Sequence, residues 1–417
     1  MRGVVFVAVL AGSVLVAGSA LAAPPAPDGC RWEVGAAAKA HHNGPSAKLF
    51  CKDDTGVWSE VTDGVDNLDP ASLTPAKARD ADALEALGFF YLNGPAAQRD
   101  EVKAREYYRR AAATGDSHAL FNYGVMLEFA HGGPEDKAGA VALYLKAGEA
   151  GQVDAMVNLG NDYANGDGVA KDINQAILWW RKAAEKGSGS AAYSLAVCYE
   201  QGQGVAKDPV QAAKWYRVGA DAGHAWSMTS LASMYEDGRG VAKDEAEAAK
   251  LYRQAGDGGD PQGDYNYARM LENGRGVERD YKAAAERYRS AANAGNESAM
   301  NNLGVLYAAG NGVDQDWVAA ARLYRSAAKR GQPNAMLNLG WCYADGDGVD
   351  QDDVQALAWF RQGAELGQTE AMVALGDFAE TGRGGMAADP VEARKWWKKA
   401  ADAGDEDGAA RLKAHAV

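Results

Sequence analysis

The feature that most constrains this 417-residue chain is a unit of 36 residues that recurs nine times. One copy reads L-G-N-D-Y-A-N-G-D-G-V-A-K-D over residues 159–172 and continues with A-I-L-W-W-R-K-A-A-E-K-G over residues 176–187. A regular period of this length predicts stacked supersecondary units rather than one globular core, so function is expected on an extended surface. The glycines that close the units are Gly115, Gly151, Gly187, Gly223, Gly259, Gly295, Gly331, Gly367 and Gly404.

Each unit contains two stretches with the hydrophobic spacing of an amphipathic helix. In the first half, Ala155, Leu159 and Tyr163 share a helix face, and Trp180 and Ala184 do so in the second half. Helices this short are unstable alone, so each must bury its apolar face on its partner and on the next unit. The recurring Trp or Tyr of the second half is therefore interpreted as a packing residue.

A Gly-x-Gly turn joins the two helical stretches in units three to nine, and an Asp follows four residues later, or five in the last unit. A carboxylate at this point can accept hydrogen bonds from the free amides of the next helix, and Pro209 and Pro390 suit a first helical position. The turns follow no strand and form neither G-x-G-x-x-G nor a Walker pattern, so phosphate binding is not expected. The predicted N-caps are Asp172, Asp208, Asp244, Asp280, Asp316, Asp352 and Asp389.

The full pattern, L-G-x-x-Y-x-x-G-x-G-V-x-x-D-x-x-x-A-x-x-W-Y-x-x-A-A-x-x-G, resembles the Sel-one-like repeat (SLR) family, a branch of the tetratricopeptide-like repeats, over residues 80–404. The resemblance implies an all-α fold, an α/α solenoid in which nine 36-residue helix-turn-helix repeats form a right-handed superhelix. It also implies an adaptor for protein partners, often in bacterial envelope or host-contact processes. The chain departs from the family pattern at Pro95, at Gly132-Gly133 and at three positions where the family prefers Tyr. Those three positions hold Leu127, Leu271 and Ala379, and the departures affect local loop shape.

The amino terminus has the features of a secretory signal peptide over residues 1–22. Arg2 precedes an apolar run over residues 4–16, and Ala20-Leu21-Ala22 supplies small residues at a cleavage point. An uncleaved anchor is the alternative, but the run is short for a membrane span, and no later apolar stretch is long enough for one. We therefore expect a mature protein that is periplasmic or secreted.

Residues 23–79 lie outside the repeats and are interpreted as an N-terminal cap, with an independent recognition module as the alternative. Residues 31–34 and 57–61 are strand-like, and Thr74-Pro75 resembles a helix start. At the other end, residues 405–417 begin another first helix and stop, as a polar terminal cap would.

Four cysteines fit an oxidising compartment. Cys30 and Cys51 lie in the cap segment and are predicted to form a disulfide. A zinc site that includes His41 and His42 is the alternative, but the spacing lacks the close cysteine pairs of structural zinc sites. Another two, Cys198 and Cys342, share one repeat position four units apart, so they are expected to be unpaired, buried residues.

The acidic composition narrows the class of partner. The formal charge is −14 and the pI is about 5.0. This argues against nucleic acid and against anionic lipid as ligands, and it favours solubility and a basic partner.

One polar position recurs on the first helices, two residues before the small residue of each Leu-Gly pair. With a spacing of 36, these side chains would lie one above another and line the inner groove that tetratricopeptide-like superhelices have. Amides donate and accept together, which suits an extended peptide backbone. The alternative is that each amide bonds a neighbouring repeat's backbone. The predicted groove residues are Asn122, Asn158, Asn266, Asn302 and Asn338, with Ser194 and Ser230 between them.

Catalytic motifs are sparse, and no cofactor or metal is predicted. Ser326 and Lys329 spell S-x-x-K without its companion motifs, and the acidic loop over residues 345–350 has Val349 where calcium needs an oxygen ligand. We therefore expect a non-enzymatic, exported interaction scaffold that binds a protein or peptide. The alternative, which the resemblance implies for cysteine-rich relatives, is an enzyme or binder active on cell-wall or β-lactam compounds.

Overall fold

A computed structural model describes strands at residues 30–34, 47–52 and 58–60, and then residues 81–93, 99–385 and 387–415. The predicted signal peptide, His41, His42 and the expected helix start at Thr74-Pro75 lie outside the described residues. The three strands form an antiparallel sheet in the order β1-β2-β3, from β1 (Cys30–Val34), β2 (Ala47–Lys52) and β3 (Trp58–Glu60). Two of these strands match the predicted patches, whereas the sequence pattern missed β2. In the β1–β2 register, Cys30 lies directly opposite Cys51.

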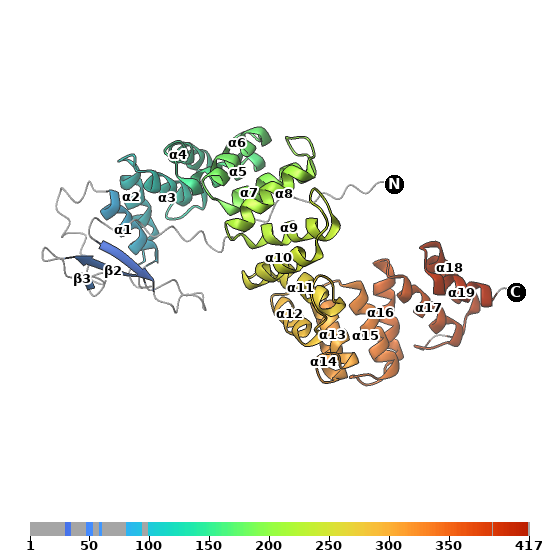
Figure 1. Cartoon of the computed structure of the whole chain (residues 1–417). Helices are drawn as coiled ribbons and strands as arrows, with labels where there is room; N and C mark the ends of the chain where they lie inside the picture. The colour runs from blue at the N-terminus through green and yellow to red at the C-terminus, as the bar shows by residue number, and fades with distance from the viewer. Residues whose placement is uncertain are drawn as a thin grey trace. The chain divides into compact units, whose positions relative to one another are not determined.

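The remaining described elements are helices in an alternating order, as the 36-residue period predicts (Figure 1). The first helices of the nine repeats are α1 (Ala81–Asn93), α3 (Ser117–Glu128), α5 (Val153–Asn165), α7 (Gly189–Gln201), α9 (Ala225–Asp237), α11 (Pro261–Asn273), α13 (Glu297–Ala309), α15 (Pro333–Asp345) and α17 (Thr369–Thr381). The second helices are α2 (Glu101–Ala112), α4 (Lys137–Glu149), α6 (Ile173–Glu185), α8 (Pro209–Asp221), α10 (Glu245–Asp257), α12 (Tyr281–Asn293), α14 (Trp317–Ala328), α16 (Asp353–Glu365) and α18 (Pro390–Asp402). None of the described helices is long and apolar enough to span a membrane.

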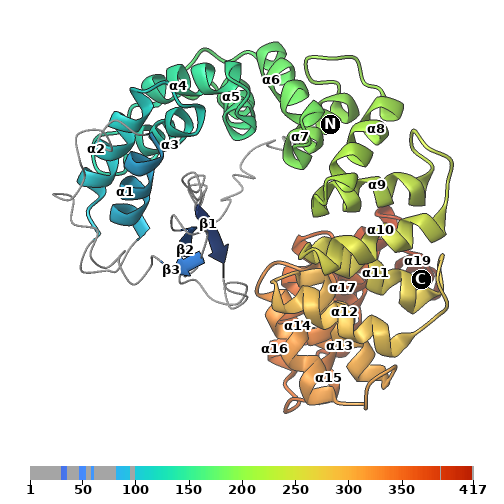
Figure 2. The same cartoon turned by 60° about the vertical axis from the view of Figure 1, so that its left-hand side comes forward.

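The chain divides into two compact units, residues 1–208 and 209–417, and each is described by itself. In the first unit, Figure 2 shows α3, α5 and α7 on the inner side of a curved row and α2, α4 and α6 on the outer side. In the second unit, each helix from α8 to α18 packs on its sequence neighbours, so the repeats stack as a solenoid.

The helices begin and end at the Asp and Gly residues that the sequence predicts. Side chains of the predicted Asp residues cap α6, α10, α12, α14, α16 and α18; for example, Asp172 accepts from Asn174 N at 2.9 Å. Each first helix from α5 onward ends at the first Gly of the turn. This Gly is the C-cap in the left-handed conformation, as at Gly346 with φ 81°. Only Gly adopts this conformation without steric cost, which explains why it recurs there.

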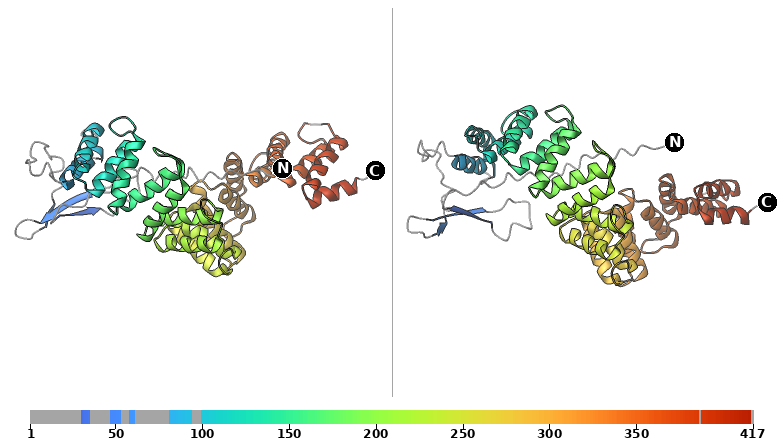
Figure 3. Two further views of the ribbon diagram at one scale, coloured as in Figure 1. Left: turned by 90° about the horizontal axis from the view of Figure 1, so that it is seen from above. Right: turned by 45° about the horizontal axis from the view of Figure 1, so that its top comes forward.

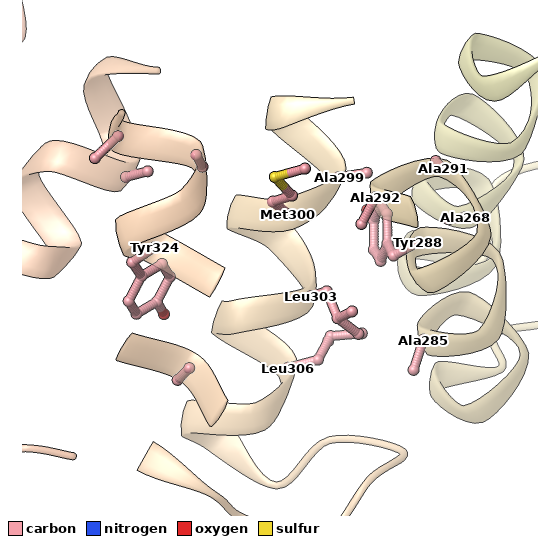
Figure 4. Close-up of a cluster of buried hydrophobic side chains, with 14 of the residues drawn as sticks. Ala268, Ala285, Tyr288, Ala291, Ala292, Ala299, Met300, Leu303, Leu306 and Tyr324 are labelled. Carbon is pink, nitrogen blue, oxygen red and sulfur yellow. The ribbon is translucent and has the colours of Figure 1, made fainter. Parts of the chain in front are cut away.

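The core of each repeat is a small residue packed under an aromatic ring. A Cβ added at Gly340 would overlap the Phe360 ring, and Gly160 lies against Trp180 in the same way. Figure 4 shows the neighbouring layer, where Leu303 and Leu306 of α13 point toward α12. The aromatic residue that recurs once in each second helix, such as Trp180 and Tyr324, is buried in all nine repeats, which confirms its interpretation as a packing residue. The structure also confirms that Cys198 and Cys342 are buried and unpaired.

Consecutive repeats meet at the second Gly of each turn. In the eighth repeat, Gly348 packs directly on the Trp317 carbonyl, at the first residue of the preceding second helix, with no space for a Cβ. Gly276 contacts the Glu245 carbonyl in the same way. Gly132 contacts the Glu101 carbonyl equivalently, so the irregular turn of the second repeat keeps this joint.

Charge pairs are matched across the same joints. Lys137 binds Asp167 in the next turn at 2.8 Å, whereas Glu245 binds Arg275 at 2.9 Å with the signs reversed. Asp353 and Arg383 repeat the second arrangement at 2.6 Å. At these three joints, the turn is therefore complementary in charge to the helix on which it packs.

The array ends with a partial repeat, as the sequence predicts. α19 (Glu406–Ala414) packs on α17 and α18 at the C-terminal end of the second unit (Figure 3). Its Arg411 binds both carboxylate oxygens of Asp377 at 3.0 Å.

Candidate partner-binding face

The five predicted groove asparagines all lie on first helices, at α3, α5, α11, α13 and α15. Asn122 is only 1% exposed, and the other four are half-buried. Because their positions are equivalent in the repeats, the structure places them at one level of each first helix. Their hydrogen-bond partners show what the amides do in the folded chain.

In the second unit, two of these asparagines belong to a continuous hydrogen-bonded chain, here called the amide relay. Asn338 Nδ2 donates to Asn301 Oδ1 at 2.9 Å, and Asn301 Nδ2 donates to Asn302 Oδ1 at 3.2 Å. Asn302 Nδ2 then donates to the Tyr288 hydroxyl at 3.1 Å, and Tyr288 donates to Glu272 Oε2 at 2.6 Å. The relay crosses four helices, so it ties three successive repeats together.

The relay includes Asn301, which the sequence reasoning did not select. This residue is 5% exposed and occupies a position where the neighbouring repeats have Tyr265 and Leu337. The adjacent amides of Asn301 and Asn302 were the available signal, because a second polar residue on a buried helix face needs a partner. Burial raises the pKa of Tyr288 well above its usual value, and the Glu272 carboxylate adds to this effect, so its hydroxyl remains a donor.

The first unit contains a related polar cluster around Tyr144. Its hydroxyl donates to Glu128 Oε2 at 2.7 Å, and the Asn158 side chain hydrogen-bonds to it. Asp162 lies in the same cluster at 5% exposure, and its Oδ2 has no hydrogen-bond partner among the described residues. Burial, with the Glu128 and Asp167 carboxylates nearby, raises the pKa of Asp162 to about 8.

The other asparagines also have side-chain partners. Asn122 Nδ2 donates to Glu85 Oε1 at 3.4 Å, and Asn266 Oδ1 accepts from Gln262 Nε2 at 3.2 Å. Where the described asparagines bond across helices, their partners are side chains rather than the backbone of a neighbouring repeat. In the folded chain, these amides are therefore engaged by neighbouring side chains.

The surface beside these amides carries exposed apolar side chains. Val305 on α13 is 39% exposed and Trp341 on α15 is 37% exposed, at equivalent positions one repeat apart. The Asn338–Asn301 hydrogen bond joins the same two helices within about one turn of them. Trp341 stands edge-on to Phe360, with ring centroids 5.0 Å apart, so its outer ring edge is held in a defined orientation. Sequence reasoning treated the recurring aromatics as packing residues and missed this exposed one.

Charge is unevenly distributed between the two kinds of helix. Among the residues of the nine described first helices, Arg269 is the only Lys or Arg, whereas every second helix from α2 to α18 contains at least one. We call the surface of α13 and α15 around Val305, Trp341 and Asp345 the first-helix face.

The weaker chemical motifs have ordinary surroundings. Ser326 Oγ donates to the Arg322 carbonyl of its own helix at 3.0 Å. Within the part of the chain that the structure describes, no three His, Cys, Asp or Glu side chains are placed to hold a metal ion. The β1–β2 register places the Cys30 and Cys51 backbones opposite one another, a separation that a disulfide can bridge.

Comparisons with known proteins agree with the geometry. The Sel1 repeat model matches nine consecutive segments, residues 81–116, 117–152, 153–188, 189–224, 227–260, 261–296, 297–332, 333–368 and 369–405. Among solved structures, the chain is similar to c5321, a protective antigen of uropathogenic Escherichia coli strains with an SLR fold, at 31% identity and a TM-score of 0.69. That match covers 74% of this chain and 66% of the antigen, so the chain spans slightly less than two thirds of the antigen's length. A Sel1 repeat protein from Oxalobacter formigenes is similar at 29% identity and a TM-score of 0.54, over 59% of this chain and 96% of that one. No curated protein matches the chain.

Proposed function

The chain belongs to the Sel1 repeat family, and from this premise we propose that it is an exported, non-enzymatic scaffold that binds a protein or peptide partner. The binding surface is the first-helix face. The observation that carries the proposal is the exposure of Val305 and Trp341 at equivalent positions on neighbouring first helices. Envelope signalling or host contact is the proposed setting, and the similarity to a protective antigen of Escherichia coli favours an exposed location.

The energetic argument rests on the indole of Trp341. Covering its remaining exposed surface would contribute on the order of 2 kcal/mol, and Trp is over-represented among residues that dominate binding energies. Packing against Phe360 keeps the ring ordered before a partner arrives, which reduces the entropic cost of binding.

The predicted asparagines have a revised place in this proposal. Asn266 and Asn338 of the second unit are half-buried, and their remaining amide groups are proposed to hydrogen-bond a bound backbone. Asn122 and Asn302 are committed to the Glu85 and Tyr288 side chains, so their role in the proposal is to hold the helices in place.

Export is proposed from residues 1–22 and from the cysteine pair. An oxidising compartment would favour a disulfide between Cys30 and Cys51, whose backbones pair across β1 and β2. Mass spectrometry of the protein from its native host tests both points. We expect loss of the first 22 residues and a mass lower by the two hydrogens of one disulfide. An intact N-terminus or two free thiols at these cysteines would contradict export or the disulfide, respectively.

Site-specific photocrosslinking tests the binding surface. A photoreactive amino acid at Trp341 should capture a partner in the native host. The same substitution at Trp317 is the control, because Trp317 is also 37% exposed but lies on the second helix α14. Capture from position 317 alone, or from neither position, would refute the assignment to the first-helix face.

A further inference from the structure

The first helices at the centre of the proposed face contain no positive charge. No Lys or Arg occurs in α13, α15 or α17, although the flanking second helices α14, α16 and α18 all contain Arg. The cations near α15 come from other elements: Arg325 of α14 donates to the Tyr343 hydroxyl at 3.0 Å, and Arg383 donates to the Ala344 carbonyl at 2.8 Å. A partner that contacts this face therefore meets no cationic side chain of α13, α15 or α17.

Asp345 is the acidic group closest to the exposed apolar pair along the chain. It lies four residues after Trp341, so both side chains are on the same side of α15. As the last residue of α15, its carboxylate is at the negative end of the helix dipole, where an acidic side chain is unfavourable. It is exposed, and among the described residues no hydrogen bond or ion pair of its side chain is present. Arg383 is close enough to interact with Asp345 electrostatically, but its hydrogen bonds go to Asp353 and to the Ala344 carbonyl, so the Asp345 carboxylate remains available to a cation of a partner.

The equivalent helix position one repeat further on, outside the first-helix face, holds a cation. Asp377 on α17 is equivalent to Val305 and Trp341, and Arg411 of α19 binds both of its oxygens. The indole of Trp397 donates to the same carboxylate at 3.1 Å. A guanidinium from a neighbouring segment is thus accommodated at this level of a first helix, beside an aromatic ring.

We propose that the first-helix face binds a basic polypeptide segment, with an apolar side chain on Val305 and Trp341 and a Lys or Arg side chain paired with Asp345. This rests on the proposed scaffold function and adds the chemistry of its partner. The formal charge of −14 would draw a basic partner to the protein from a distance.

The test uses the full chain and three fluorescent 12-residue peptides of one Leu/Ala pattern, in which every third residue is Lys, Gln or Glu. Fluorescence anisotropy measures their affinities at physiological salt. We expect the Lys peptide to bind best, with a loss of about tenfold for Trp341→Ala and about threefold for Asp345→Asn. Matched controls are Trp317→Ala and Asp350→Asn, which should change affinity less than about twofold.

The controls separate specific binding from general attraction to an acidic protein. If Trp317→Ala and Asp350→Asn weaken the Lys peptide as much as the variants of the face, the proposed site is wrong. If the Gln or Glu peptide binds as well as the Lys peptide and also depends on Trp341, the face binds peptides but the basic chemistry is wrong. If no peptide depends on Trp341, the inference fails, whereas the scaffold proposal is decided separately by the crosslinking at Trp341 and Trp317.

Discussion

Replacing Gly348 with Ala is expected to weaken the joint between the seventh and eighth repeats. Gly348 has a φ of 71°, in the left-handed region, and it packs on the Trp317 carbonyl. An added methyl group would overlap that carbonyl and the Val318 amide nitrogen, which belong to the first turn of α14. A clash with backbone cannot be relieved by rotating a side chain, so either α14 or the turn must move.

Gly331 provides a matched control, because it differs from Gly348 in one respect. Its φ is 92°, so an Ala there has similar backbone strain, but no heavy atom lies within 4 Å of the Cβ position. The left-handed conformation costs about 1–2 kcal/mol at either site. Overpacking adds about 1–3 kcal/mol at Gly348 alone. We therefore expect a loss of about 1–2 kcal/mol for Gly331→Ala and about 2–5 kcal/mol for Gly348→Ala.

Urea denaturation followed by circular dichroism measures the overall loss. Because a repeat array need not unfold in one step, hydrogen exchange of peptides from α13 to α16 should locate it. Exchange should increase on both sides of the joint in Gly348→Ala and remain near wild type in Gly331→Ala. The effect of Gly→Ala on the unfolded chain is common to both variants and cancels in the difference. If both variants lose the same stability within about 0.5 kcal/mol, the joint does not depend on the close contact at Gly348.

Three further predictions concern the buried polar groups and the charge pairs. Asn301→Ala breaks the amide relay and should cost about 1–3 kcal/mol in thermal unfolding. The exposed Asn293→Ala should cost less than about 0.5 kcal/mol, and equal losses would show that the relay adds no stability. Because the folded protein raises the pKa of Asp162 to about 8, the unfolded chain ionises first and stability falls as the pH rises from about 4 to about 8. Asp162→Asn should remove this part of the pH dependence. The melting temperature of the variant, relative to that of wild type, should therefore rise between pH 5 and pH 8. A difference in melting temperature that does not change with pH would contradict the assignment. Lys137→Asp and Asp167→Lys should each destabilise the protein, because each brings like charges together. The double variant, which reverses the ion pair, should restore most of the stability that either single change removes. Each loss should be no more than about 1 kcal/mol, since both groups are 39% exposed, and a double-mutant cycle without coupling would refute the pairing.

The charge pairs suggest how the order of the repeats is maintained. Equivalent joints carry Lys–Asp at Lys137 and Asp167, but Asp–Arg at Asp353 and Arg383. Nearly identical repeats could otherwise stack out of order during folding, and a mismatched joint would bring like charges together. Complementary pairs therefore add specificity to joints whose shared geometry comes from glycine.

The sequence by itself determined the repeat, the helix ends and the packing residues. These follow from local rules: helical spacing selects the buried face, Asp caps the free amides, and Gly adopts the left-handed turn. The edge strands β1 and β3 of the N-terminal sheet were also predicted in part. The sequence pattern missed β2, because Ala47–Lys52 lacks a clear alternation of apolar and polar residues.

Only the tertiary structure decided what the polar side chains do. Asn301 and Asn338 are 37 residues apart, and whether their amides meet depends on how two helices are rotated when the repeats stack. The exposure of Trp341 depends on the same stacking, because the equivalent position is open at Trp341 and Val305 but buried at Val125. Local sequence therefore specifies each repeat, and the contacts between repeats specify the surface that a partner meets.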